Sequence, residues 1–233
     1  MPTASDPPGV PPTPAAARTS PDSDPHAASQ VASAPGEPRW HSRGYLPHVG
    51  QPGLIQAIAF RLHDSLPQSK LKQWERELVN FPEEERKQKL RAWIEKYLDA
   101  GHGSCWLRDL RIGSLVENAM LFFDSQRYNL LAWCVMPNHV HVLIETMAGW
   151  DLGKLLHSWK GYSAHEATKL LGRKGEFWQR EYFDRFIRDG EHYENVLRYI
   201  ENNPVKSGLV HIAEAWPLSS ARWRRRAPSL PFA

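Results

Sequence analysis

The sequence is poor in cysteine and has no long apolar segment. Its 233 residues include only two cysteines, Cys105 and Cys134, too few to suggest the disulfide framework of a secreted scaffold. No apolar run approaches the roughly 20 residues that a transmembrane helix needs. The N-terminus also lacks the charged segment and apolar segment of a secretory signal. We therefore expect a cytoplasmic protein in a reducing environment, with no membrane partner.

Large apolar side chains are scarce in the first 38 residues. Val10 and Val31 are the only β-branched aliphatic residues there, among Pro, Ala, Ser, Thr, Asp and Gly. Such a composition cannot bury enough apolar surface to offset the loss of chain entropy on folding. The sequence predicts a disordered tail over residues 1–38, a folded domain over 39–213 and a basic tail over 214–233.

Charge is nearly balanced over the chain but is concentrated locally. The net charge is only +3, while the pI near 8.9 and the eleven histidines favour a polyanionic partner. Residues 70–100 form a strongly charged segment, in which Pro82 followed by Glu83, Glu84 and Glu85 predicts the start of a helix. These charges are typical of a solvated helix face, and a contact surface for nucleic acid is the alternative.

Hydrophobic periodicity predicts an α+β fold. The expected order is a strand over 54–62, helices over 82–101 and 112–123, strands over 128–135 and 139–145, a helix over 152–171, an extended aromatic segment over 177–188 and a last helix over 191–203 that ends at Pro204. The two strands that flank residues 136–138 are joined tightly enough to form an antiparallel hairpin. This order favours a small antiparallel sheet packed by helices.

Two histidines lie two positions apart in one of these strands. Because strand side chains alternate, His139 and His141 share one face, while Val140, Val142 and Ile144 line the other. A single buried histidine is usually satisfied by a carbonyl group or water. Two on one face are harder to explain as structural, since each must be hydrogen-bonded. The pair therefore indicates metal binding or acid–base chemistry, without identifying the metal.

The last predicted helix carries a second candidate pair. Tyr199 lies off the apolar stripe of this helix, and Asn203 follows it by four residues on nearly the same side. A phenol and a carboxamide oxygen could therefore point into one site. Pro204 leaves the direction of Asn203 open, and a packing role for Tyr199 is the alternative.

Aromatic and basic residues also alternate along the chain, in Trp159-Lys160, in 177–180 and in 182–185. Stacking platforms beside cations suit single-stranded nucleic acid. A tryptophan-rich core with an ordinary charged surface explains the same pattern. Both interpretations stay open at the level of the sequence.

Three motifs together resemble a known family. Trp133–Leu143, Phe177-Trp178-Gln179 and Tyr199–Leu209 are similar to segments of the REP-associated tyrosine transposases. These enzymes belong to the Y1 transposase group of the HUH (His-hydrophobic-His) endonucleases, with the small insertion-sequence transposases. A bare His-x-His is a weak signal, but its combination with Tyr-x-x-x-Asn-Pro-Val-Lys is specific. The resemblance covers about residues 45–210 and implies a ferredoxin-like α+β fold, with the histidines on a central strand of an antiparallel sheet.

The resemblance also implies a mechanism. The protein would be a metal-dependent single-stranded DNA endonuclease and strand transferase that acts at hairpin-forming, REP-like DNA. His139 and His141 would hold Mg²⁺ or Mn²⁺, and Asn203 would be the third ligand, where insertion-sequence relatives have glutamine. Tyr199 would form a 5′-phosphotyrosine link and leave a free 3′-OH. Because two imidazoles depart from the oxygen preference of Mg²⁺, we expect stronger activity in Mn²⁺.

Further expectations concern partners. The DNA, single-stranded or hairpin, is expected to contact Lys160, Trp178, Gln179, Arg180, Arg185 and Lys206. The resemblance is compatible with a monomer or a homodimer, associated with the nucleoid in the cytoplasm. A histidine-triad nucleotide hydrolase is strongly disfavoured because its third histidine would fall at Leu143. A non-catalytic protein that binds hairpin DNA and retains the transposase fold is the remaining alternative.

Overall fold

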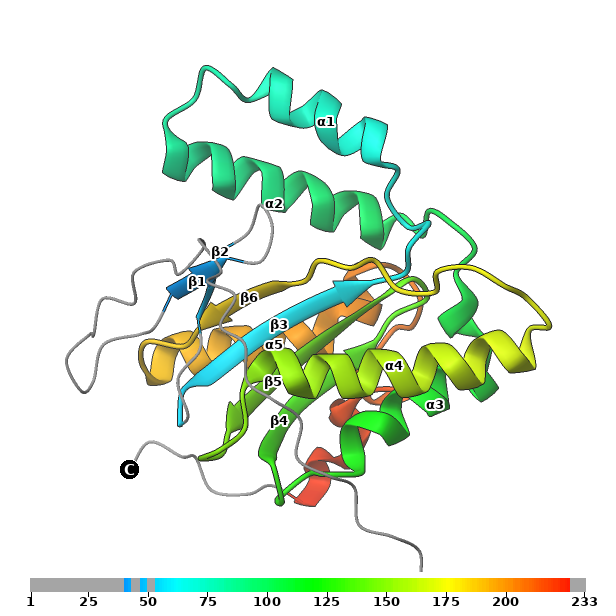
Figure 1. The fold of residues 1–233 in the computed structure, drawn as a ribbon. Coiled ribbons are helices and arrows are strands. Elements are labelled where there is room, and N and C mark those ends of the chain that lie inside the picture. Colours follow the sequence, from blue (N-terminus) through cyan, green and yellow to red (C-terminus); the bar gives the residue numbers. More distant parts are fainter. Residues whose placement is uncertain (1–39, 43–46, 50–52, 227–233) are drawn as a thin grey trace, which may run out of the picture. The chain divides into compact units, whose positions relative to one another are not determined.

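A four-stranded antiparallel sheet forms the centre of the computed structural model (Figure 1). The structure describes residues 40–42, 47–49 and 53–226, all within one folded unit, Gly36–Ala233. The tail predicted over residues 1–38 lies outside the described residues. The strands lie in the order β4-β5-β3-β6, and their bounds are Ile55–Arg61 for β3, Tyr128–Val135 for β4, His139–Thr146 for β5 and Phe183–Phe186 for β6.

The connections between these strands follow the ferredoxin-like pattern β-α-β-β-α-β. Helices separate β3 from β4 and β5 from β6, while β4 and β5 form a direct hairpin. The helices are α1 (Gln68–Glu77), α2 (Glu83–Asp99), α3 (Leu110–Leu121), α4 (Leu152–Leu170) and α5 (Gly190–Lys206). Short elements complete the described chain: strands β1 (Trp40–Ser42) and β2 (Pro47–Val49), and 3-10 turns η1 (Trp106–Arg108), η2 (Ala213–Ala215) and η3 (Ser220–Arg226). The predicted fold class is confirmed.

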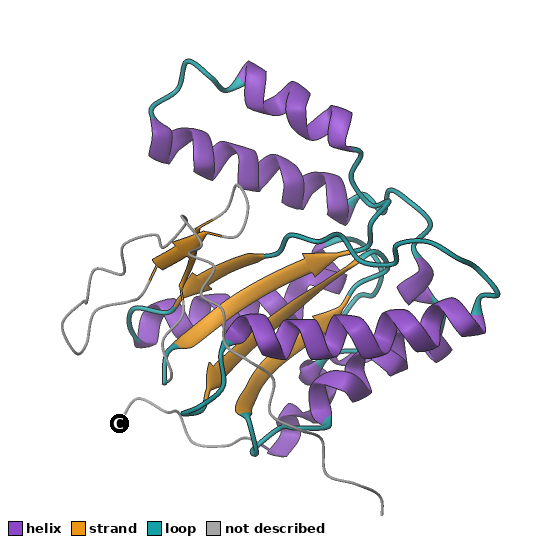
Figure 2. Cartoon of the chain, viewed as in Figure 1, coloured by secondary structure: helices purple, strands orange, loops and turns teal. Residues whose placement is uncertain are grey.

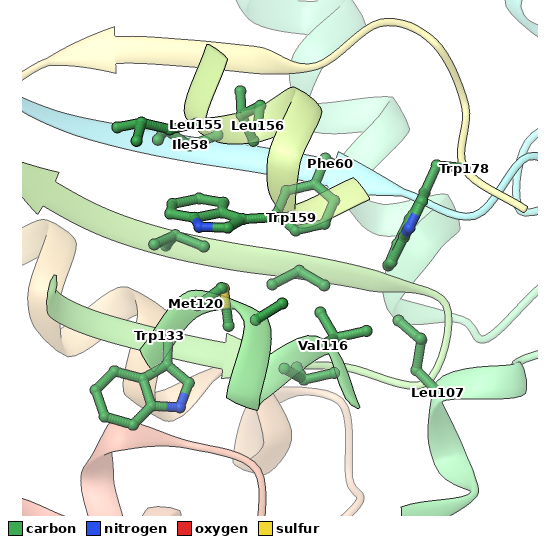
Figure 3. Close-up of a cluster of buried hydrophobic side chains, with 14 of the residues drawn as sticks. Ile58, Phe60, Leu107, Val116, Met120, Trp133, Leu155, Leu156, Trp159 and Trp178 are labelled. Atoms are coloured by element: carbon green, nitrogen blue, oxygen red, sulfur yellow. The ribbon is translucent and has the colours of Figure 1, made fainter. Parts of the chain in front are cut away.

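One face of the sheet is covered by α3 and α4. Figure 3 shows the tightly packed side chains of this face, with Trp159 of α4 above the strands. Val140, Val142 and Ile144 of β5 point into this cluster and are fully buried. The alternation predicted for the histidine strand therefore holds.

Helix α5 covers the opposite face, so that the sheet lies between two helical layers (Figure 2). Ile200 and Val196 of α5 pack against Leu143 of β5 and Ala57 of β3. His141 pairs with Cys134 of β4 on one side and with Ala59 of β3 on the other. The histidines thus lie on a central strand, as the resemblance implied.

The prediction that the last helix ends at Pro204 is wrong. Helix α5 continues to Lys206 and ends where Gly208 adopts a positive φ of 68°. Proline removes one helical hydrogen bond, but it lies in the last turn, where Ser207 N donates to Asn203 O and Leu209 N donates to Pro204 O. Pro204 is also buried, so packing offsets the lost bond.

The charged segment over residues 70–100 forms two helices with a small core of their own. The helix expected after Pro82 is α2, and the preceding helix, α1, packs against it through Leu71, Trp74, Ile94 and Leu98. Part of the segment assigned to a basic tail also packs on the sheet, since Val135 N donates to Leu218 O at 2.8 Å. No helix in the described ranges is long and apolar enough to cross a membrane.

Candidate active site

The two histidines of β5 converge in the layer between the sheet and α5. His139 is 1% exposed and His141 is 6% exposed, and their Nε2 atoms lie 3.0 Å apart. Nδ1 of His139 lies 2.7 Å from Asn138 Oδ1. Because an amide oxygen only accepts, Nδ1 carries the proton and Nε2 keeps its lone pair. This is the usual arrangement of a metal-binding histidine.

Asn138 is a positioning residue that the sequence did not reveal. It is fully buried, and its Nδ2 donates to Leu98 O at 3.1 Å and to His102 O at 2.8 Å. The same amide therefore orients His139 and ties the end of α2 to the histidine strand. Its only signal in the sequence was its place directly before His139 in the motif.

Burial keeps both imidazoles neutral at physiological pH. It lowers the pKa of His139 to about 3, and the positive charge of Lys206 acts in the same direction. Burial and the neighbouring His139 hold the pKa of His141 well below its usual value. Neutral imidazoles are the form that binds metal ions.

Tyr199 of α5 lies over the histidine pair. Its ring meets that of His141 edge to face, with 5.6 Å between the centroids. Its hydroxyl is buried and lacks a hydrogen-bond partner in the described part of the chain. Burial raises the pKa of Tyr199, and the carboxylates of Glu95 and Asp99 raise it further. The phenol therefore stays protonated unless a positive charge or a proton acceptor assists its ionisation.

Asn203 lies one helical turn after Tyr199, because α5 runs on through Pro204. The side chain is fully buried, and Nδ2 donates to Tyr199 O at 3.0 Å. This bond directs the amide and leaves Oδ1 without a partner among the described residues. The structure thus places Tyr199 against the histidine pair and Asn203 one helical turn from Tyr199, while the roles predicted for these residues stay predictions.

Asp99 is a further residue in this region. It is the last residue of α2, and its side chain is 13% exposed. Its Oδ1 lies 3.9 Å from His139 Nε2, and its Oδ2 accepts a hydrogen bond from Lys206 Nζ at 2.8 Å. The sequence could not reveal this position, since residue 99 is remote from both partners along the chain.

The chemical types of the donor atoms near the histidine pair suit a divalent cation. Buried polar atoms normally have hydrogen-bond partners, yet the described chain leaves the side-chain oxygens of Tyr199, Asn203 and Ser207, and Oδ1 of Asp99, without one. No group of three or more His, Cys, Asp or Glu side chains in these ranges is arranged to hold a metal ion. An amide oxygen, such as that of Asn203, is a donor of a kind outside this set of side chains.

Comparisons with known proteins agree with the motifs. Residues 113–203 match the family described as "Transposase IS200 like". A REP-associated tyrosine transposase of Escherichia coli (strain K12) is 30% identical over 107 residues, or 46% of this chain and 62% of that protein. A Haemophilus influenzae protein named "Putative REP-associated tyrosine transposase" is 28% identical over 103 residues, or 40% of this chain and 58% of that protein.

The resemblance to REP-associated tyrosine transposases is confirmed. The chain spans about three fifths of the length of these curated relatives. A solved structure of a REP-associated tyrosine transposase bound to a REP hairpin covers 81% of this chain and 88% of that one, at 20% identity and a TM-score of 0.48.

The residues predicted to contact DNA fall into two groups in this transposase-like chain. Lys206 lies beside the candidate site, with its Nζ 5.3 Å from the centre of the Tyr199 ring, and Arg185 is exposed on β6. Lys160, Trp178 and Arg180 instead line a cavity of about 740 Å³ beside α4, and Gln179 bonds to β3 through its backbone, which donates to Arg61 O.

Two members of the second group have internal structural contacts. Trp178 is 6% exposed, and its Nε1 donates to Ser163 Oγ at 3.0 Å. Its ring therefore belongs to the core and does not offer a face for a base. Lys160 Nζ donates to the carbonyl oxygens of Gln179 and Arg180 at 2.7 and 2.9 Å. These contacts fasten the aromatic segment to α4, which favours the core interpretation of that pattern.

Proposed function

We propose that the protein is a metal-dependent single-stranded DNA endonuclease and strand transferase that acts at hairpin-forming DNA. The observation that carries the proposal is the contact of a buried tyrosine with two buried, neutral histidines, with the Asn203 amide one helical turn from that tyrosine. The names of the curated relatives favour REP-like hairpins as the DNA. The oligomeric state, monomer or homodimer, stays a prediction, as does association with the nucleoid.

In this proposal His139, His141 and Asn203 hold Mg²⁺ or Mn²⁺. The ion, when bound, supplies positive charge that polarises a scissile phosphate. The histidines are suited to it because burial keeps both imidazoles neutral, and Asn138 fixes the ring of His139. Asn203 adds an oxygen donor, for which Mg²⁺ and Mn²⁺ have a preference.

Tyr199 is the proposed nucleophile. Its Oη forms a bond to phosphorus while the bond from phosphorus to the 3′-oxygen breaks, and the product is a 5′-phosphotyrosine. The phenol loses its proton, and the departing 3′-oxygen gains one. Because the raised pKa of Tyr199 opposes ionisation, attack depends on a compensating positive charge nearby. A 3′-OH can later attack the phosphotyrosine, which reverses the bond changes and joins strands.

A covalent adduct tests this proposal. The protein is incubated with end-labelled, hairpin-flanked single-stranded DNA and Mn²⁺, and the products are separated on a denaturing gel. We expect a labelled protein–DNA adduct that disappears in Tyr199→Phe and in the presence of a metal chelator. Tyr162→Phe is the matched control, since Tyr162 is exposed on α4 and lies outside the site.

Two results would contradict the proposal. An adduct that persists in Tyr199→Phe would show that another residue is the nucleophile. Binding of the hairpin without cleavage, in both Mg²⁺ and Mn²⁺, would favour the non-catalytic DNA-binding protein instead.

A further inference from the structure

Helix α2 ends directly beside the histidine pair. Asn138 bonds to the backbone at the end of this helix, and Asp99 reaches toward His139 from its last turn. The carbonyl end of a helix carries partial negative charge, which favours a cation nearby. The charged helical segment over residues 70–100 therefore contributes directly to the candidate site.

We propose that Asp99 is an additional ligand of the divalent cation, and that Lys206 holds its carboxylate until the cation displaces the lysine. This inference rests on the proposed metal site and adds a residue that the sequence motifs do not contain. It also gives Lys206 a role: in the metal-free protein, its ammonium group pairs with the Asp99 carboxylate.

The separations between donor atoms are compatible with a shared ion. Two ligands with bonds of about 2.1 Å to one ion lie about 3.0 Å apart when adjacent and about 4.2 Å apart when opposite. The two histidine Nε2 atoms are 3.0 Å apart, and Asp99 Oδ1 is 3.9 Å from His139 Nε2. Both separations fall within this range.

The chemistry of the donor set also calls for a carboxylate. His139, His141 and Asn203 are all neutral, whereas Mg²⁺ and Mn²⁺ are bound in proteins mainly by carboxylate and carbonyl oxygens. Asp99 would supply both an oxygen and a negative charge. Its Oδ1 is buried and has no hydrogen-bond partner in the described part of the chain, while Lys206 holds the other oxygen, Oδ2.

The ion pair with Lys206 explains why Asp99 is not already arranged as a ligand. As the side chains lie, the described chain has no ready cluster of three His, Cys, Asp or Glu groups around one point. Oδ2 of Asp99 is held by Lys206 Nζ at 2.8 Å. The lysine side chain is 52% exposed, so it can move into water at low cost when a divalent ion takes its place.

Two substitutions in the same ion pair test the inference. Asp99→Asn and Lys206→Met both break the contact, so a merely structural ion pair predicts the same kind of change in each. Our proposal predicts opposite changes in Mn²⁺ affinity, measured by isothermal titration on the full chain without DNA. Asp99→Asn should weaken binding by about 10-fold or more, whereas Lys206→Met should strengthen it, because the competing cation is gone.

The controls separate ligation from general effects of charge and folding. Lys87→Met removes the same charge from the exposed face of α2, where Lys87 pairs with Glu83, and should leave Mn²⁺ affinity unchanged. Asp99→Glu retains the carboxylate and should bind Mn²⁺ better than Asp99→Asn does. Circular dichroism and thermal unfolding show whether each variant is folded. If Asp99→Asn does not fold, the Mn²⁺ affinities of Lys206→Met and Asp99→Glu test the inference.

The outcomes also distinguish this inference from the proposed function. If Asp99→Asn binds Mn²⁺ like the wild type, or if both variants of the pair change affinity in the same direction, the role of Asp99 is refuted. The proposed function would survive that result if the wild type still forms the Tyr199 adduct. A wild type that binds no Mn²⁺ refutes both Asp99 ligation and metal dependence.

Discussion

Both faces of β5 are buried, but they differ in whether their buried polar side chains have hydrogen-bond partners. Beneath α4, the indole of Trp159 donates to the hydroxyl of Tyr128 at 3.0 Å, and this hydroxyl donates to Met120 O. Trp178 is likewise bonded to Ser163. Beneath α5, the side-chain oxygens of Tyr199 and Asn203 and Oδ1 of Asp99 have no hydrogen-bond partner within the described residues.

This difference separates structural burial from functional burial. A buried polar atom without a partner costs about 1–3 kcal/mol, so a face that serves only as core is expected to pair its polar atoms. The α5 face, where the neutral histidines also lie, bears this free-energy cost. Departures of this kind are expected at functional sites. Substitutions on neighbouring β5 residues should therefore have opposite consequences on the two faces.

The largest effect is expected on activity from His141→Ala. Loss of one imidazole from the proposed metal site should reduce formation of the DNA adduct by about 10³-fold, which corresponds to about 4 kcal/mol. The free energy of unfolding should change by about 1 kcal/mol or less, because removal of a buried imidazole also removes its desolvation cost. Single-turnover adduct assays and urea unfolding measure the two quantities. Near-wild-type cleavage by a folded variant would contradict the assignment.

A smaller effect, and on stability instead, is expected from Val142→Ala. Val142 is fully buried and faces α4. Loss of two methyl groups, with the small cavity left behind, should lower the free energy of unfolding by about 2 kcal/mol. Adduct formation should persist at temperatures where the variant is folded. If Val142→Ala impaired cleavage as severely as His141→Ala while folded, the two faces would not be functionally distinct.

Local patterns predicted the parts of this contrast that depend on neighbouring residues. Alternation along a strand was enough to place His139 and Val140 on opposite faces, and the bounds expected for β4 match those observed. Helical spacing likewise related Tyr199 to Asn203. Each of these relations is set by the backbone geometry of one element, so the sequence alone could specify it.

Other features depend on contacts between distant segments. Asp99 meets Lys206 only because α2 ends beside α5, and no periodicity reveals that approach. Trp178 lies beside basic residues in the sequence, as a DNA-stacking residue would. Its partner Ser163, on α4, shows that it belongs to the core instead. Pro204 normally ends a helix, and only its burial at the end of α5 explains why this helix continues.

The smallest effect is a dependence of stability on pH, on the α4 side of the molecule. Burial lowers the pKa of Lys160 to about 8 from its usual 10.5. Between these values the unfolded chain binds a proton that the folded chain does not, so this residue's contribution to the free energy of unfolding rises with pH. Relative to Lys160→Met, the wild type should therefore gain stability between about pH 7 and about pH 8.5, by less than about 4 °C in Tm. Thermal unfolding of both proteins at the two pH values measures this change. An unchanged difference in Tm would mean that Lys160 remains protonated while it is bonded to Gln179 O and Arg180 O, and that even this well-paired face accommodates a buried charge.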